Sequence, residues 1–146
     1  MLALFGSRDD IPQRDAEQRA LLVTTPGEKH VFGMDMVAEF MRAAGRDVMA
    51  AHHVSPRQAA ALVKRERFGI LGVALSSHAG LETAAQLIKS ARQASAVADL
   101  RVIVGGPLFL HEPELVAQVG ADASAQDAPT AVMLARKLLI TGAAPK

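Results

Sequence analysis

The stretch LLVTTPGEKHVFG, residues 21–33, is the part of the sequence that most clearly indicates the fold. It opens with an apolar run, residues 21–25, that is typical of a buried strand. Pro26 and Gly27 then end the strand, and apolar residues at helical spacing begin after Gly33. A strand, a glycine-marked loop and a helix form the first half of a βαβ unit, and ligands bind at the loop that follows such a strand.

The alternation of strand and helix continues to the end of the chain. Further strands are expected at residues 47–51, 68–75, 100–104 and 120–123, and helices at residues 34–44, 56–67, 80–94, 114–119 and 129–139. The run FGILGVAL at 68–75 is apolar throughout, which is typical of a central parallel strand covered on both faces. The connections are long enough for right-handed crossovers. We therefore predict a flavodoxin-like, doubly wound α/β fold with a five-stranded parallel sheet, the first strand inside and the second at an edge.

Length and composition set the broad class. The 146 residues predict a single domain at residues 21–146, preceded by an N-terminal lead-in at residues 1–20. A net charge of +1 gives no electrostatic case for nucleic acid or a membrane as the main partner. The absence of cysteine excludes disulfides, thiolate metal sites and iron–sulfur clusters. Because no apolar run approaches the ~20 residues that span a bilayer and no signal peptide is recognisable, we expect a cytoplasmic protein.

Four of the five histidines fall at or just after the ends of expected strands. His30 follows the first strand, His52 and His53 follow the second, and His78 follows the third. Parallel strands end at one edge of the sheet, so these side chains share that edge, and His30 and His78 flank the crevice where the strand order reverses. A histidine in a polar loop is more often solvated than a ligand. We give that interpretation to His52, His53 and His111, and leave His78 open.

His30 is the candidate metal ligand, because it lies in the glycine-marked loop with Glu28 two residues before it. A metal-bound imidazole usually donates its other N–H to a carboxylate, and Glu28 is the expected acceptor. As a loop carboxylate, Glu28 is expected to be exposed and to contribute little to stability. Gly105 and Gly106 end the fourth strand beside the same crevice, where glycine permits either a simple turn or close approach of the backbone to a bulky ligand.

Several other kinds of site do not fit the sequence. A receiver-type phosphorylation site needs an acidic pair after the first strand and an aspartate after the third, where this chain has TTPGEKH and SSH. The dinucleotide motif G-x-G-x-x-G and the P-loop are both absent. Ser76 and Ser77 lack the G-x-S-x-G context of a nucleophilic serine. No acid–base machinery is visible, so we expect that the protein is not an enzyme.

The spacing Glu28-x-His30-x-x-Gly33 resembles the D-x-H-x-x-G motif of cobalamin-binding domains, with Glu in place of Asp. The resemblance implies a cobalamin-binding-domain topology with cobalamin as the cofactor. It also implies that His30 displaces the dimethylbenzimidazole base and becomes the lower axial ligand of cobalt, while the freed nucleotide tail enters the sheet crevice.

The same resemblance implies two further contacts with the nucleotide tail. In the family, an S-x-L motif follows the third strand and a G-G pair follows the fourth. Gly105 and Gly106 match the pair. Ser76 and Ser77 stand where the S-x-L motif is expected, but this chain has no leucine there, so either serine is a candidate for the contact.

Four longer segments resemble the AerR/PpaA group of bacterial transcriptional antirepressors, namely GEKHVFGMDMVAEFMRAAGRDV, IKSARQAS, VIVGGPLF and VGADASAQDAPTAV. The chain is similar also to the haem-binding domain called "sensor containing haem instead of cobalamin". The resemblance implies a stand-alone sensory domain that acts on a transcriptional repressor or other DNA-binding protein, with light as a candidate signal. The alternatives are a haem-binding redox or gas sensor, a cobalamin-carrying small subunit of a mutase or methyltransferase, and a domain that binds no pigment and only contacts a protein.

Overall fold

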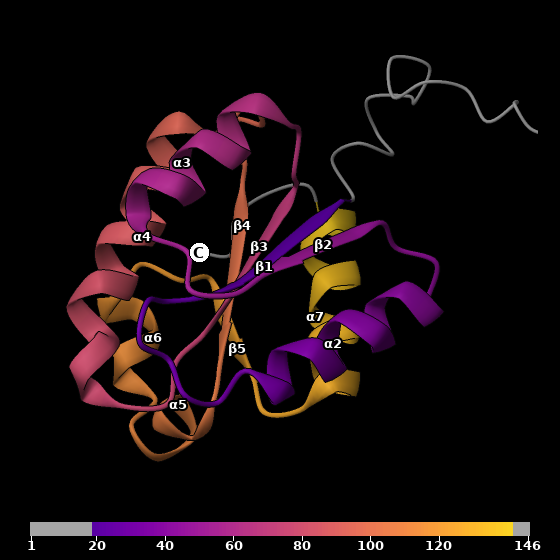
Figure 1. Ribbon diagram of the computed structural model, residues 1–146. Coiled ribbons are helices and arrows are strands. Elements are labelled where there is room, and N and C mark those ends of the chain that lie inside the picture. The colour runs from indigo at the N-terminus through magenta and orange to yellow at the C-terminus, as the bar shows by residue number, and fades with distance from the viewer. Residues whose placement is uncertain (1–18, 142–146) are drawn as a thin grey trace, which may run out of the picture.

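The computed structural model describes residues 19–141, and within them five strands form one sheet in the order β2-β1-β3-β4-β5 (Figure 1). Every neighbouring pair is parallel. The strands are β1 (Ala20–Thr24), β2 (Val48–Ala51), β3 (Ile70–Ala74), β4 (Arg101–Gly105) and β5 (Ala123–Ala125). This order confirms the predicted flavodoxin-like fold, with the first strand inside and the second at an edge.

Helices cover both faces of the sheet (Figure 1). On one face α2 (Phe32–Ala43) packs beside α7 (Ala128–Thr141). The other face carries α3 (Pro56–Arg65), α4 (Leu81–Ala94), α5 (Pro107–His111) and α6 (Glu114–Gln118), with the 3₁₀ turn η2 (His78–Gly80) before α4. None of the helices in residues 19–141 has the length and apolar character needed to cross a membrane.

The continuous apolar strands follow from this layering. In β1, Leu21 and Val23 pack into the core under α3 and α4, whereas Ala20 and Leu22 pack into the core under α2 and α7. Because both faces of a central parallel strand are covered, its residues are apolar in succession instead of alternating with polar ones. The apolar sequence of β1 is thus explained by its inner position.

The fifth strand lies at Ala123–Ala125, so the prediction of a strand at residues 120–123 is wrong. Gly120 has a φ of +89°, which belongs to a turn. The carboxylate of Asp122 accepts the backbone N–H of Val102 at 2.8 Å, which ties this turn to β4 just before the strand begins. The sequence also predicted no helix for α5, which starts directly after β4.

Two residues of the predicted lead-in, Arg19 and Ala20, belong to the described fold. Arg19 is buried and donates to Asp47 at 2.8 Å and to Glu66 at 3.0 Å, while its guanidinium lies 4.6 Å from the centre of the Phe68 ring. β1 then starts at Ala20. The rest of the predicted lead-in, residues 1–18, and the last residues, 142–146, lie outside the described part of the chain.

Candidate functional site

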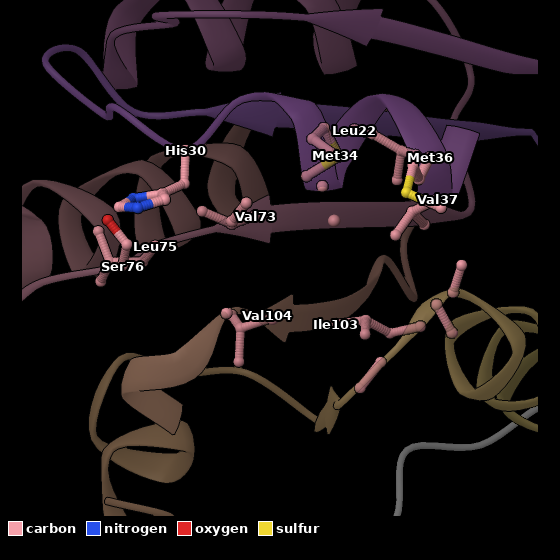
Figure 2. A pocket seen from close by; sticks show the side chains of 18 of the residues that line it. Leu22, His30, Met34, Met36, Val37, Val73, Leu75, Ser76, Ile103 and Val104 are labelled. Atoms are coloured by element: carbon pink, nitrogen blue, oxygen red, sulfur yellow. The ribbon is translucent and has the colours of Figure 1, made fainter. Parts of the chain in front are cut away.

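A pocket of about 640 Å³ opens at the carboxyl edge of the sheet and runs between the strands and helices α2 and α7 (Figure 2). It lies over β1, β3 and β4, where the strand order reverses and where open α/β sheets bind their ligands. Its volume is typical of small-molecule sites. One end is polar and holds Glu28, His30 and Ser76, and the inner part is apolar, lined by Leu22, Met34, Met41, Ile70, Ile103 and Ala131.

Glu28 is the centre of the polar end. Its carboxylate accepts the Ser76 hydroxyl at 2.6 Å, the Ser76 backbone N–H at 3.1 Å and the His30 backbone N–H at 3.0 Å. Its side chain is only 3% exposed, so the prediction of an exposed loop carboxylate is wrong. The side chain turns inward because the end of β3 offers it two donors, and these donors compensate the cost of burying a charge.

These contacts also set the ionisation of Glu28. Burial on its own raises the pKa of a carboxyl group, but here the hydrogen bonds from Ser76 and from the His30 backbone, with the charge that His30 can carry, outweigh it. The net result is a pKa of Glu28 below its usual range. Glu28 is therefore a carboxylate at neutral pH, which is the form that accepts all three hydrogen bonds.

We expect Glu28 to make the stability of the fold depend on pH. In the unfolded chain Glu28 has an ordinary pKa, which is higher than its pKa in the folded state. The stabilisation that ionised Glu28 gives to the folded state is therefore complete at neutral pH and is lost as the pH falls through the folded-state pKa. Urea unfolding from about pH 7 to about pH 3 should therefore show a free-energy gap between wild type and Glu28→Gln that narrows on the acid side. Glu39→Gln, at an exposed carboxylate of α2, is the control. A gap that stays constant over this range would contradict the assignment.

His30 stands at the mouth of the pocket with its side chain 73% exposed (Figure 2). Its Nδ1 lies 3.6 Å from the Glu28 carboxylate, which is longer than a hydrogen bond but places the expected acceptor beside that nitrogen. The other ring nitrogen, Nε2, is then the one suited to bind a ligand. The structure thus brings together His30 and its predicted carboxylate partner.

The predicted glycines differ in what they do. Gly33 lines the pocket, and a Cβ added there would meet no atom within 4 Å, so the missing side chain leaves free space beside the mouth. Gly105 also lines the pocket, where a Cβ would lie 3.2 Å from the carbonyl oxygen of Ala125. Gly106 has a φ of +120°, and a Cβ there would overlap with the carbonyl oxygen of Leu75. Gly106 is therefore required by the chain's own packing.

The remaining predicted residues lie at the same edge but do not line the pocket. Ser77 is exposed, so only Ser76 of the two candidate serines reaches the site. His78 lies 2.7 Å from a carboxylate oxygen of Glu112. His52 bonds to Asp35 at 2.8 Å and lies 3.3 Å from the Thr24 hydroxyl, so its interpretation as a simply solvated side chain is wrong.

The inner wall of the pocket is what the sequence analysis missed. Met34, Met36 and Met41 of α2 line it, although their spacing indicated only the apolar face of a helix. Three methionines in one helix were the available signal, because this flexible side chain suits surfaces that adapt to a ligand. Within residues 19–141, no group of three or more His, Asp or Glu side chains could hold a metal ion.

A doubly wound sheet with a pocket at its carboxyl edge and an exposed imidazole at the mouth defines a small-molecule-binding α/β domain. The sequence matches the B12 binding domain family over residues 18–135, and the chain belongs to that family. A search of curated proteins finds no match for the sequence. The family agrees with the cobalamin-binding resemblance of the sequence, whereas the AerR/PpaA group within it stays a prediction.

Solved structures share this fold. A novel cobalamin-binding protein from Desulfitobacterium hafniense has a TM-score of 0.71 at 22% identity, over 82% of this chain and 58% of that one. The monomethylamine corrinoid protein of Methanosarcina barkeri has a TM-score of 0.70 at 18% identity, over 86% of this chain and 61% of that one. The chain thus spans about three fifths of the length of both. A CheY-like protein from Pseudomonas aeruginosa has a TM-score of 0.62 at 20% identity, over 88% of this chain and 97% of that one.

Proposed function

We propose that this chain is a sensory cobalamin-binding domain and not an enzyme, with His30 as the lower axial ligand of cobalt. The observation that carries the proposal is the position of the Glu28 carboxylate, which holds the His30 backbone and lies beside Nδ1 of its ring. A carboxylate at Nδ1 favours the tautomer with the proton there and raises the basicity of Nε2. Ser76 in turn holds the carboxylate from the end of β3.

The residues present fit a corrinoid. The exposed imidazole of His30 is a nitrogen ligand of the kind that cobalt accepts. Free space beside Gly33 and the apolar inner pocket suit a large, flat group with an aromatic tail. When bound, the corrinoid supplies a metal centre whose ligation and redox state can change, and that chemistry belongs to the cofactor. Haem has no comparable support, because the family and the two corrinoid-related structures all point to a corrinoid.

We propose further that the domain acts in the cytoplasm on a transcriptional repressor or another DNA-binding protein, with light as a candidate signal. The support is the resemblance of four segments to the AerR/PpaA antirepressors. One of these segments, residues 27–48, carries both the loop with His30 and helix α2. A net charge of +1 gives no reason to expect direct binding to nucleic acid.

The second candidate function is a corrinoid carrier for a methyltransferase or mutase. The observation that favours it is the TM-score of 0.70 with the Methanosarcina barkeri monomethylamine corrinoid protein. A carrier hands its cofactor to a catalytic subunit that encloses the substrate, whereas a sensor contacts a regulator in a way that depends on the cofactor. The protein partner therefore separates the two functions.

The partner can be identified by affinity capture from cells of the source organism, with the protein loaded with hydroxocobalamin or left free. We expect to recover a DNA-binding regulator, in amounts that differ severalfold between the loaded and the cofactor-free protein. The reason is that a cofactor that stabilises one conformation of the domain changes its affinity for a partner that recognises that conformation. His78→Ala, at an exposed histidine outside the pocket lining, is a control that should recover the same partner. Recovery of a catalytic subunit in place of a regulator would favour the carrier function.

A further inference from the structure

Two side chains that the proposed cofactor site does not use, Asp35 and His52, join helix α2 to the end of β2. Asp35 lies in the first turn of α2, and its Oδ1 is 2.8 Å from Nε2 of His52. The pair lies at the surface, with the His52 side chain 29% exposed and the Asp35 side chain 54% exposed. Val31, the N-cap residue of α2, provides no side-chain cap. The bond to His52 is thus an anchor of this helix start to the sheet.

The anchor continues into the core through Thr24, the last residue of β1, which is fully buried. The Thr24 hydroxyl oxygen accepts the backbone N–H of His53 at 2.9 Å. Its own proton is then free to be donated to Nδ1 of His52 at 3.3 Å, and Nε2–H of His52 donates to Asp35. With the proton of His52 on Nε2, these contacts link β1 through the end of β2 to α2.

The backbone at this point is unusual. His53 has a φ of +58°, the only positive φ at a non-glycine residue among those described. A residue other than glycine enters this region at an energetic cost, which persists where the surroundings enforce it and is concentrated at functional sites. Here the left-handed turn lets the His53 N–H reach Thr24 while the preceding side chain, His52, faces Asp35.

The location of the anchor gives it a role. Residues 28–34 all line the pocket, and His30 within this segment stands at the mouth. On one side Glu28 holds this segment to Ser76 at the end of β3, and on the other side Asp35 holds it to His52 at the end of β2. We propose that Asp35 and His52 are positioning residues, which fix the far end of the segment that presents the His30 imidazole to its ligand.

This inference takes the identity of the ligand from the proposed function. The contacts of Asp35 and His52 do not depend on that function, so they are tested first in the cofactor-free protein. Amide hydrogen exchange at residues 30 and 35, whose N–H groups donate to the Glu28 carboxylate and to the Val31 carbonyl, should be about threefold faster in Asp35→Ala and in His52→Ala, because losing a partly exposed ion pair eases local opening. The double variant should exchange no faster than either single variant, since both remove the same bond. Glu39→Ala is the matched control, a carboxylate one turn further along α2 whose bond goes to Arg42 of the same helix.

The second measurement is a titration with hydroxocobalamin, followed by its visible spectrum. Both alanine variants should bind about fivefold more weakly and show a smaller fraction of the spectrum with histidine on cobalt. Asp35→Asn should bind nearly as wild type does, because its amide oxygen can accept the same bond. The Glu39→Ala control should match wild type in both measurements.

The outcomes separate the inference from the proposed function. Unchanged exchange in Asp35→Ala and His52→Ala overturns the inference, and so does faster exchange with an unaltered affinity and spectrum, which would mean a structural role alone. The thermal unfolding midpoint of every variant is measured first, and the titrations are carried out at a temperature well below the lowest of these midpoints. If wild type itself gives no spectral change with hydroxocobalamin, the proposed function fails, and the exchange result still decides whether the anchor holds the His30 segment.

Discussion

Replacing His30 by alanine is expected to weaken hydroxocobalamin binding at least about 100-fold, because losing only a carboxylate partner of a metal-bound histidine already costs roughly 10–100-fold. The variant loses the imidazole at the pocket mouth, while Glu28 keeps its bonds to Ser76. Wild type should give the spectrum of a corrinoid whose own base has left cobalt. Any cofactor bound to His30→Ala should keep the spectrum of the free cofactor.

His78→Ala is the matched control for this titration. His78 is another exposed histidine at the same edge of the sheet, but it contacts Glu112 and does not line the pocket. It should therefore bind hydroxocobalamin as wild type does. Equal spectra and affinities for His30→Ala and wild type would remove His30 from the metal site, and a loss in His78→Ala alone would transfer the role to that residue.

Gly106→Ala is expected to lower the free energy of unfolding by about 3 kcal/mol, the upper range for a single substitution. The backbone at Gly106 has a φ of +120°, where residues with a Cβ are strained. The new Cβ would also overlap with the backbone carbonyl oxygen of Leu75, which cannot rotate away as the end of a side chain can. Urea unfolding of the cofactor-free protein measures the loss.

Gly33→Ala is the contrasting substitution. Its φ is ordinary and the added Cβ would meet nothing within 4 Å, so its unfolding should match wild type or shift slightly toward higher stability. The fold therefore requires glycine at position 106, whereas at position 33 it can accept alanine. If both variants unfold like wild type, then the close approach of Gly106 to Leu75 does not constrain the fold as described.

A parallel sheet covered on both faces was predictable because its central strands are apolar throughout, whereas the strand order was taken from the flavodoxin-like fold. A run such as residues 68–75 can bury the apolar side chains of both its faces only between two layers of helices. Because the strands are then parallel, the histidines that follow them lie at one edge of the sheet. β5 could not be located in the same way. Its three residues, Ala-Ser-Ala, are small and only half-buried, so nothing in their pattern distinguishes a strand from the turn before it.

The site was predictable where its residues are close in sequence. Glu28 and His30 stand two positions apart, and a carboxylate beside a histidine is a recognisable pattern. Ser76 is 48 positions from Glu28, and its two hydrogen bonds are what make the carboxylate buried instead of exposed. The pairing of Asp35 with His52, 17 positions apart, likewise depends on how α2 lies against the end of β2. Such partners are set by packing, which no local pattern records.

The Glu28 carboxylate has a mechanical consequence for whatever acts on the imidazole. One carboxylate holds both segments at 2.6 to 3.1 Å, because its Oε2 accepts the His30 backbone N–H and the Ser76 hydroxyl while its Oε1 accepts the Ser76 backbone N–H. The loops after β1 and β3 therefore cannot shift independently without breaking a hydrogen bond to a buried charge. We therefore expect a displacement of the His30 backbone to be accompanied by a displacement of the segment after β3.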